Sequence, residues 1–257
     1  LLLACLFPAL AWADLLGAES SSLVRDGIPN IPDQIVRSLE PYSSYHGSTL
    51  HGWALGGGLG EGLILKNRSS QGTSYRLLDK PGGRPRAIGE FPLTARASLV
   101  RPGSRLQTLL LVEDPDGSER VDFYLYDTAS KTKTRLSNDR TKFAGACWSP
   151  DGKTIATSCN ARNGVDFDLT LIDENGVRTR LWESQGMWVP NSWTPDGNFL
   201  VVTQPLSSEH QRLHLFDLKQ KRMIPFDSEP ERVWMGYPIL LDDAVFYLSD
   251  RGQEYRS

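Results

Sequence analysis

One six-residue stretch decides the fold because it occurs twice, as Trp148-Ser149-Pro150-Asp151-Gly152-Lys153 and, 45 residues later, as Trp193-Thr194-Pro195-Asp196-Gly197-Asn198. In each copy, proline pre-sets the backbone angle φ at the first turn position and aspartate can accept a hydrogen bond from its own backbone. Glycine then takes the positive φ that reverses the chain. The predicted turn residues are Pro150, Asp151, Gly152, Pro195, Asp196 and Gly197. Each stretch therefore predicts the tip of a β-hairpin in a repeated unit.

A second marker follows the same repeat: a strand that ends in aspartate and is followed by a basic, turn-containing return. These aspartates are Asp79, Asp127, Asp173 and Asp217, separated by 48, 46 and 44 residues. A period in the forties that carries about four strands matches a propeller blade, and nothing between the turns has the 3.6-residue period of a helix. The sequence therefore predicts an all-β fold, a β-propeller of four-stranded blades.

We place the predicted blades at residues 47–92, 95–138, 142–184 and 187–228, with a partial fifth at 233–257, which makes about four and a half blades. In the first two, the segments Trp53-Ala54-Leu55-Gly56-Gly57 and Val100-Arg101-Pro102-Gly103-Ser104 stand where the Trp-x-Pro-Asp-Gly turn is expected. Because a propeller closes to remove its sheet edges, this count leads us to expect further sequence beyond the C-terminus.

Composition agrees with a globular β protein. The 257 residues are 39% hydrophobic and 23% charged, enough to bury a sizeable core. The 23 glycines and 16 prolines favour a turn-rich chain. With a net charge of −3 and no basic run, the chain lacks the electrostatic footprint of a nucleic-acid-binding protein.

The first thirteen residues are apolar and end in Ala11-Trp12-Ala13, the pattern that precedes signal-peptide cleavage. The run is too short to span a bilayer, so we expect a partial signal peptide, export to the periplasm or the extracellular space, and no stable membrane insertion after cleavage. Two alternatives stay open: a buried core segment, and a lipobox ending at Cys5. Residues 14–46 are expected to form a leader with one short helix, at 31–40, that stops at Pro41.

The two remaining cysteines are predicted to be unpaired. If the Pro150-Asp151-Gly152 turn sets the register, Cys159 lies opposite about Phe143, some four residues along the strand from Cys147. That separation is roughly 13 Å at the rise of a strand, which is too far for a disulfide. Both thiols are therefore expected to act as small buried hydrophobic groups.

Three patterns suggest ligands but fail the templates of their sites. His210 and His214 are four residues apart on a predicted strand, roughly 13 Å, so they cannot share one metal ion. The glycine-rich segment 56–62 has Glu61 where a dinucleotide loop needs glycine and no lysine after its last glycine. In the segment 114–119, Glu119 stands where a calcium loop needs glycine. We therefore expect no cofactor and no metal, and assign the tryptophans to packing between blades.

The Pro-Asp-Gly repeats resemble the periplasmic propeller of the Tol system and, more closely, the N-terminal propeller of the prolyl oligopeptidase family of serine peptidases, with its dipeptidyl and acylaminoacyl peptidases. Three features follow in family order between residues 30 and 257. They are the segment 31–36, which looks like the short pre-propeller helix, the segments 147–156, 160–164 and 166–168, which look like the central blade, and the segment 249–256, which looks like the Ser-Asp-Arg-Gly-x-Glu-aromatic-Arg element.

The resemblance implies the propeller portion of an exported serine peptidase, which caps the active site and filters short peptides. The C-terminal α/β-hydrolase domain would be missing from this chain. No serine has glycine at both −2 and +2, so we expect no catalytic residue in residues 1–257. Arg162 and Arg251, each in a loop after a strand, are the candidates for reaching the hydrolase interface or a peptide terminus. The alternative is a non-enzymatic Tol-like scaffold that binds a protein partner, and fold alone does not separate the two.

Overall fold

The computed structural model describes residues 32–43, 47–54, 62–69, 71–101, 108–137, 141–183, 185–226, 233–241 and 244–252. These residues belong to two units, one that ends at Ser44 and one that begins at Tyr45. The predicted signal peptide, Cys5 and most of the glycine-rich segment 56–62 lie outside the described residues.

The first unit contains one described helix, α1 (Asp33–Ser43). Its first turn holds Asp33, whose negative charge suits the helix N-terminus, and the carbonyl of Pro32 accepts the amide of Ile35 at 2.8 Å. The prediction that the helix stops at Pro41 is wrong, because the helix continues to Ser43. The φ of proline is already helical, so close to a helix end it costs one missing N–H without ending the helix. No helix among the described residues is long and apolar enough to cross a membrane.

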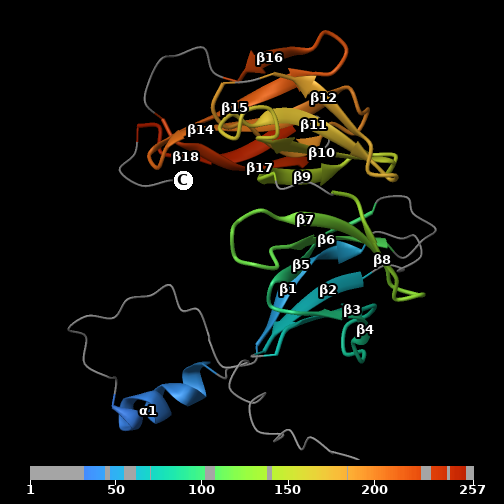
Figure 1. Cartoon of the computed structure of the whole chain (residues 1–257), viewed down its shortest axis with the longest axis vertical. Coiled ribbons are helices and arrows are strands. Elements are labelled where there is room, and N and C mark those ends of the chain that lie inside the picture. Colours follow the sequence, from blue (N-terminus) through green and yellow to red (C-terminus); the bar gives the residue numbers. More distant parts are fainter. Residues whose placement is uncertain are drawn as a thin grey trace, which may run out of the picture. The chain divides into compact units, whose positions relative to one another are not determined.

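The described residues of the second unit are all-β and form four four-stranded antiparallel sheets and one two-stranded sheet, coloured in chain order in Figure 1. In each sheet, the strands pair in the order in which they occur in the sequence. The predicted all-β propeller of four-stranded blades is thus confirmed.

The strands are as follows. The first sheet holds β1 (Ser48–Ala54), β2 (Gly62–Arg68), β3 (Thr73–Leu78) and β4 (Arg86–Phe91), and the second holds β5 (Ala95–Val100), β6 (Thr108–Glu113), β7 (Asp122–Asp127) and β8 (Lys133–Arg135). The third sheet holds β9 (Phe143–Trp148), β10 (Thr154–Cys159), β11 (Asp168–Asp173) and β12 (Arg178–Trp182). The fourth holds β13 (Val189–Trp193), β14 (Phe199–Ser207), β15 (His210–Asp217) and β16 (Arg222–Pro225), and the fifth holds β17 (Met235–Leu241) and β18 (Ala244–Ser249).

Because consecutive strands run in opposite directions, successive connections alternate between the two ends of a sheet. We call the turn end the one with the connections after the first and third strands, such as β9–β10 and β11–β12. The loop end carries the connection after the second strand, such as β10–β11, and the connection to the next sheet. The first strands of successive sheets contact one another, β5 with β9, β9 with β13 and β13 with β17.

The core lies between neighbouring sheets, and the second strand of a sheet contributes buried side chains to the core on both sides of that sheet. In β6, Leu109 and Leu111 pack with Tyr75 of the first sheet, whereas Leu110 and Val112 pack on the other side. The latter two share a cluster with Ile155 of the third sheet. A strand that is buried on both faces needs a continuous apolar run, which is the pattern seen in the sequence.

A bulge recurs in the first strands. His51, Ser98 and Asn191 are the extra residues at the same point of β1, β5 and β13, and β9 and β17 shift register there too. Counted from the bulge, Trp53, Trp148 and Trp193 hold equivalent positions. In β5, Val100 takes this position, so Arg101 follows it at the point where the turn begins.

The register of the third sheet confirms the prediction for the cysteines. Cys159 pairs with Phe143, whereas Cys147 pairs with Ala156. Both thiols are free and buried. Burial raises the pKa of Cys147 to about 12, so this group behaves as a small apolar side chain.

Candidate functional site

The first predicted turn, at residues 149–153, lies at the turn end of the third sheet and is closed by its own polar groups. The amide of Gly152 donates to the carbonyl of Ser149 at 2.8 Å, and Gly152 has a φ of 69°. Asp151 Oδ1 accepts the Ser149 hydroxyl at 2.6 Å and the Lys153 amide at 3.1 Å. These bonds, the hydroxyl bond first, hold the pKa of the Asp151 carboxyl below its ordinary value.

The second predicted turn repeats this geometry with threonine in place of serine. Asp196 Oδ1 accepts the Thr194 hydroxyl at 2.5 Å and the Asn198 amide at 3.0 Å. The amide of Gly197 donates to the carbonyl of Thr194 at 2.8 Å, and Pro195 lies between them in the sequence. Each aspartate therefore bonds donors of its own turn, which is a structural task.

Arg101, which the sequence did not single out, joins the second and third sheets at the turn end. Its Nε donates to the carbonyl of Gly152 at 2.5 Å, and its Nη2 lies 2.7 Å from Glu174 Oε2. The guanidinium carbon also lies 5.5 Å from the ring centroid of Trp148. One side chain thus contacts both turns of the neighbouring sheet.

At the loop end, the connection between β10 and β11, residues 160–167, is a compact structure that we call the third-sheet loop. Asn160 and Gly164 exchange two hydrogen bonds, from Asn160 Nδ2 to the Gly164 carbonyl and from the Gly164 amide to the Asn160 carbonyl, both at 2.8 Å. Asn163 Oδ1 accepts the amides of Val165 and Asp166 at 3.0 and 2.9 Å. Local side-chain bonds of this kind fix the backbone of a loop without a regular element.

Arg162, a predicted contact residue, fastens this loop to the sheet. Its Nε and Nη2 bond the two oxygens of Asp168 at 2.9 and 3.1 Å, and Nη2 also reaches Asp166 at 3.3 Å. The side chain of Asp168 is only 4% exposed, so this forked pairing neutralises a buried charge. The carboxylate of Asp168, above all, raises the pKa of Arg162. Whether Arg162 also contacts a partner or a peptide stays a prediction.

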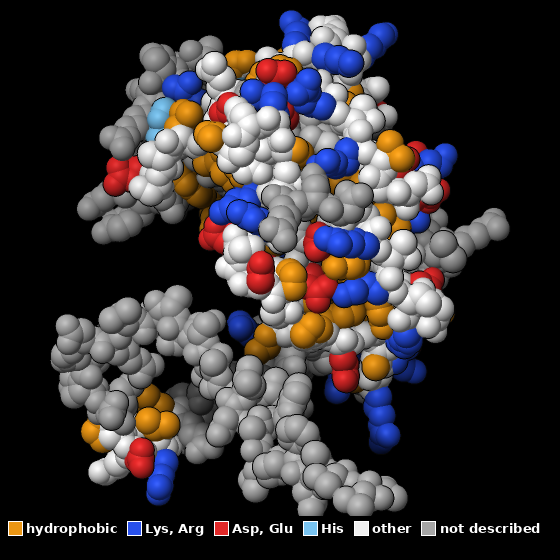
Figure 2. Space-filling model, in the orientation of Figure 1, with side chains coloured by type: hydrophobic (Ala, Val, Ile, Leu, Met, Phe, Trp, Pro, Cys, Tyr) orange, Lys and Arg blue, Asp and Glu red, His pale blue; other side chains and the backbone are white. Residues whose placement is uncertain are grey.

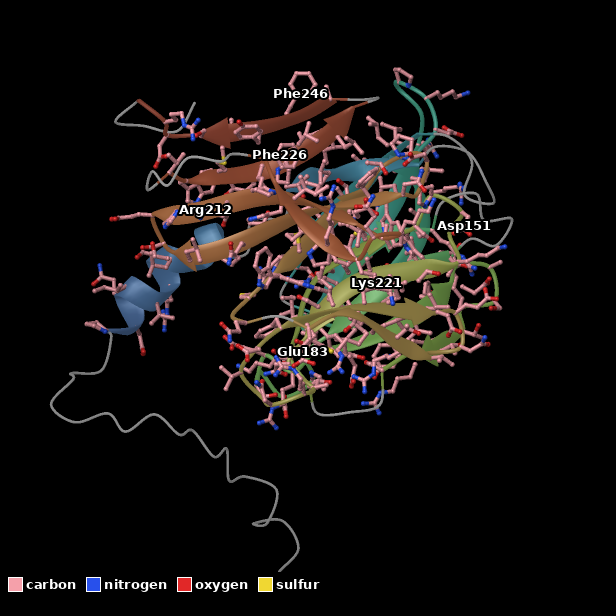
Figure 3. The ribbon with its side chains drawn as sticks, turned by 90° about the horizontal axis from the view of Figure 1, so that it is seen from above. Asp151, Glu183, Arg212, Lys221, Phe226 and Phe246 are labelled. Carbon is pink, nitrogen blue, oxygen red and sulfur yellow. The ribbon has the colours of Figure 1, made fainter. Side chains whose placement is uncertain are left out.

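A second set of bonds ties the third-sheet loop to the connection that leads into the fourth sheet. Asp166 Oδ1 accepts the amide of Gly186 at 2.7 Å, and the amide of Phe167 donates to the carbonyl of Gly186 at 2.8 Å. The Gly186 amide, followed by the Asn163 side chain, lowers the pKa of the Asp166 carboxyl. Figure 3 labels Glu183, at the start of this connection, and Asp151, in the turn at the other end of the sheet.

A shallow cavity of about 250 Å³ lies beside Arg162. Its described lining residues are Cys159, Ala161, Arg162, Asp168, Thr170, Arg178 and Arg180. Arg180 Nη1 lies 3.7 Å from Asp168 and 3.5 Å from Glu183, so charges of both signs alternate around the cavity. Among these described lining residues, no histidine stands next to the Cys159 thiol or the Thr170 hydroxyl.

Arg251, the other predicted contact residue, follows β18 at the loop end of the fifth sheet. Its amide donates to the Ser249 hydroxyl at 3.2 Å, and the neighbouring Asp250 exchanges bonds with the backbone of Trp234. Arg162 and Arg251 thus lie in corresponding connections, each after the second strand of its sheet, but Asp250 matches Asn160 in its bonds, so Arg251 is one position earlier than Arg162. A role of Arg251 in recognition stays a prediction.

The three described histidines lie in different surroundings, and His46 lies outside the described residues. His51 packs edge-on against Tyr75, and His214 is buried edge-on against Trp188 with ring centroids 4.9 Å apart. Burial, followed by the charge of Arg212, lowers the pKa of His214 to about 4. His210 Nε2 accepts a bond from Arg212 Nε at 3.2 Å. Within the part of the chain that the structure describes, no three metal-binding side chains form a group.

Sequence reasoning missed the residues that make the third-sheet loop rigid and the residue at its tip. Asp166 and Asp168 were read only as part of a family motif, and Val165 was not considered. Val165 is 73% exposed, which is unusual for a large apolar side chain, and it stands between Gly164 and Asp166. A lone β-branched residue after Asn-Gly, in a loop rather than a strand, is the sequence signal that could have found it.

Positively and negatively charged side chains are mixed on the face of the molecule that Figure 2 shows. In the view of Figure 2, Lys and Arg side chains are interspersed with Asp and Glu, which agrees with the net charge of −3. The face shown in Figure 2 therefore does not present the one-sign patch that a polyanionic partner would need.

Comparison with known proteins finds propellers of two kinds. No family model matches the chain. The Tol-Pal system protein TolB of Desulfosudis oleivorans is 23% identical over 153 residues, which cover 59% of this chain and 33% of that protein. TolB from Acinetobacter baumannii has a TM-score of 0.54 at 14% identity, over 73% of this chain and 48% of that structure. A prolyl endopeptidase has a TM-score of 0.61 at 10% identity, over 84% and 35%.

The chain therefore spans about a third of the length of the curated relative that it matches. At these identities the structural likenesses show the fold alone. The chain is a propeller that is similar both to TolB propellers and to those of prolyl oligopeptidase-type enzymes.

Proposed function

We propose that this chain is the propeller portion of an exported serine peptidase, where it caps the active site and filters peptide substrates. The catalytic α/β-hydrolase domain would belong to the same polypeptide and lie outside residues 1–257. Export is supported by the apolar run that ends in Ala11-Trp12-Ala13.

The observation that carries the proposal is the ordered set of family motifs. They begin at the helix α1, continue through the turn and loop of the third sheet, and end at the Ser249-Asp250-Arg251-Gly252 segment after β18. The contacts between neighbouring sheets agree with this role, because a domain that selects peptides by size has to keep its shape. Neighbouring sheets are joined by apolar clusters and by bonds that cross between them, such as the bond from the Ala97 amide to the Tyr75 hydroxyl at 3.1 Å.

A second function is favoured by one specific observation, the sequence match with a TolB protein over 153 residues. In this case the propeller would be a non-enzymatic scaffold of a Tol-Pal-type system and would bind a protein partner. Propellers serve both purposes, so the choice depends on what the rest of the protein contains.

The test uses the full coding sequence that contains this chain. The purified product is treated with a fluorophosphonate probe, which reacts with an activated serine, and is assayed with a dipeptide nitroanilide and with a peptide several times longer. We expect one labelled serine outside residues 1–257 and hydrolysis of the short substrate that is about tenfold faster or more. A product that is neither labelled nor hydrolytic would overturn the peptidase proposal, and retention of a Tol-Pal component would support the scaffold.

A further inference from the structure

The shallow cavity beside Arg162 is lined by more positive than negative charge, although the whole chain has a net charge of −3. Its described lining includes three arginines, Arg162, Arg178 and Arg180, and one carboxylate, that of Asp168. The Asp168 side chain is 4% exposed, and both of its oxygens already accept hydrogen bonds from Arg162. The described lining therefore carries three positive charges against one negative charge.

The fold brings these arginines together from two separate segments. Arg178 and Arg180 are two residues apart on β12, so their side chains leave the same face of the sheet. Arg180 pairs with Thr170 of β11, which also lines the cavity. Arg162 reaches the cavity from the third-sheet loop. A strand and a loop thus place their guanidinium groups around one hollow.

A carboxylate of the chain itself marks the place where these groups hold an anion. Glu183 Oε1 lies 3.6 Å from Arg162 Nη1, and Glu183 Oε2 lies 3.5 Å from Arg180 Nη1, so one carboxylate bridges two guanidinium groups. Both distances exceed the length of a charge-assisted hydrogen bond, about 2.7 to 2.9 Å. The Glu183 side chain, labelled in Figure 3, is 58% exposed. Exposed pairs of this kind add little stability, so an incoming anion can displace Glu183.

The chemistry and the size of the cavity select the class of ligand. A guanidinium group is planar and always charged, and it binds the oxygens of a carboxylate or a phosphate in pairs. The cavity volume of about 250 Å³ is below the range of sites for drug-sized molecules, which is about 300 to 1,000 Å³. The cavity therefore accepts a small anion or the anionic end of a longer molecule. The small side chains of Ala161 and Cys159 supply the apolar part of its lining.

We propose that this cavity is a binding site for a small oxoanion, a carboxylate or a phosphate, which replaces the Glu183 carboxylate between Arg162 and Arg180. Arg180 is the main ligand-binding residue, because Arg162 is already paired with Asp168 and Asp166. The inference goes beyond the proposed function and does not depend on it. Every residue of the site lies in this chain, and the site would serve a peptidase and a scaffold alike.

Isothermal titration calorimetry of the full-length protein tests the site with three probes: N-acetylalanine, its uncharged amide and inorganic phosphate. The variants are Arg180→Ala, Glu183→Gln and, as the matched control, Arg84→Ala, at an exposed arginine of the first sheet. Circular dichroism checks that each variant is folded, and Arg180→Gln replaces Arg180→Ala if the latter does not fold. Treatment with the fluorophosphonate probe beforehand blocks any catalytic serine.

We expect at least one of the two anions to bind and the amide not to bind. Arg180→Ala should weaken this binding about tenfold, because a charge-assisted bond is lost, and Arg84→Ala should leave it unchanged. Glu183→Gln should strengthen it about threefold, because the competing carboxylate is gone, an effect that a purely structural role of Arg180 does not produce. Tighter binding of N-acetylalanine would identify the ligand as a carboxylate, and tighter binding of phosphate would identify it as a phosphate.

Three results would overturn the inference. They are the absence of binding by both anions, equal binding of the amide, and an affinity that neither Arg180→Ala nor Glu183→Gln changes. A protein that binds the anion but has no serine labelled by the fluorophosphonate contradicts the proposed function alone. A labelled protein that binds neither anion contradicts this inference alone.

Discussion

Replacing Arg101 with alanine should uncouple the second and third sheets at their turn end. Arg101 follows the last residue of β5, and its side chain is only 13% exposed. It bonds the carbonyl of Gly152 in one turn and Glu174 in the other, and it lies over the ring of Trp148. The truncated side chain reaches none of these groups, and the Gly152 carbonyl, in a buried residue, loses this charged donor.

The size of the effect follows from these three contacts. A hydrogen bond from a charged donor is worth about 1.5 to 3 kcal/mol, and a cation over a mostly buried tryptophan about 1 kcal/mol. The pair with Glu174 adds less, about 0.5 kcal/mol, because the Glu174 side chain is 53% exposed and water screens the pair. Since one guanidinium makes all three contacts, the terms are not additive. We therefore expect the free energy of unfolding to fall by about 3 kcal/mol in total.

Urea denaturation measures this loss. With a slope of about 3 kcal/mol per molar urea, the midpoint should fall by about 1 M in the Arg101→Ala variant. Arg84→Ala is the matched control, because Arg84 is an exposed arginine of the turn after β3, and its midpoint should stay within about 0.2 M of the parent. Glu174→Gln should cost about 0.5 kcal/mol. If Arg101→Ala and Arg84→Ala unfold at the same urea concentration, the contacts of Arg101 with the third sheet do not stabilise the fold as argued.

Three further predictions concern single positions. The pKa of His214 falls from 6.5 to about 4 on folding, so the unfolded state binds more protons than the folded state between these pH values. The free energy of unfolding should therefore fall by about 3 kcal/mol from pH 7.5 to pH 4. His214→Leu should remove this part of the pH dependence, as measured by urea titrations at several pH values. Gly164→Ala should cost about 1 kcal/mol of stability, because Gly164 has a φ of 77° and an added Cβ would meet no atom within 4 Å. Gly176→Ala should cost about 3 kcal/mol, because Gly176 has a φ of 81° and an added Cβ would also lie 2.6 Å from the Leu136 carbonyl oxygen. Comparing the thermal unfolding of the two variants separates the cost of backbone strain from the cost of the steric clash. Cys147 should resist iodoacetamide at pH 8 in the folded protein and react in urea, as read by mass spectrometry, and rapid alkylation of the folded protein would contradict its burial.

The repeat could be predicted from the sequence because its chemistry is local. Asp151 bonds residues two positions away on either side, and Asp173, the residue at the end of β11, accepts the amides of Asn175 and Val177 at 2.9 and 2.8 Å. The aspartate that marks the end of a third strand is thus the cap of the turn that follows. A marker with a local cause returns in each repeat, and for the same reason the pairing of Cys159 with Phe143 could be counted from the turn.

Other features have causes that lie far away in the sequence. Arg101 bonds Gly152, which is 51 residues away, and no local rule connects a residue in a decayed turn to the turn of the next sheet. The alternation of polar and apolar residues along β1 and β13 does not predict the bulges at His51 and Asn191, because a bulge depends on how the strand bends against its neighbours. Arg162 was hidden for a different reason: its partner Asp168 is only six residues away, but the fold alone shows that this carboxylate is buried and needs a cation.

The two ends of the third sheet use their polar groups in different ways. At the turn end, the Gly152 carbonyl and Glu174 bind Arg101 of the second sheet, so the turn end helps to hold the array of sheets together. At the loop end, bonds of Asn163 and Arg162 join residues of the third-sheet loop to one another, to Asp168 of β11 and to Glu183 of the next connection. Local bonds of this kind order the third-sheet loop from within its own sheet. Loss of Arg101 should therefore lower stability without altering the third-sheet loop, and the amides of Gly164 and Asp166 should exchange with deuterium equally slowly in the parent and in the Arg101→Ala protein at temperatures where both are folded.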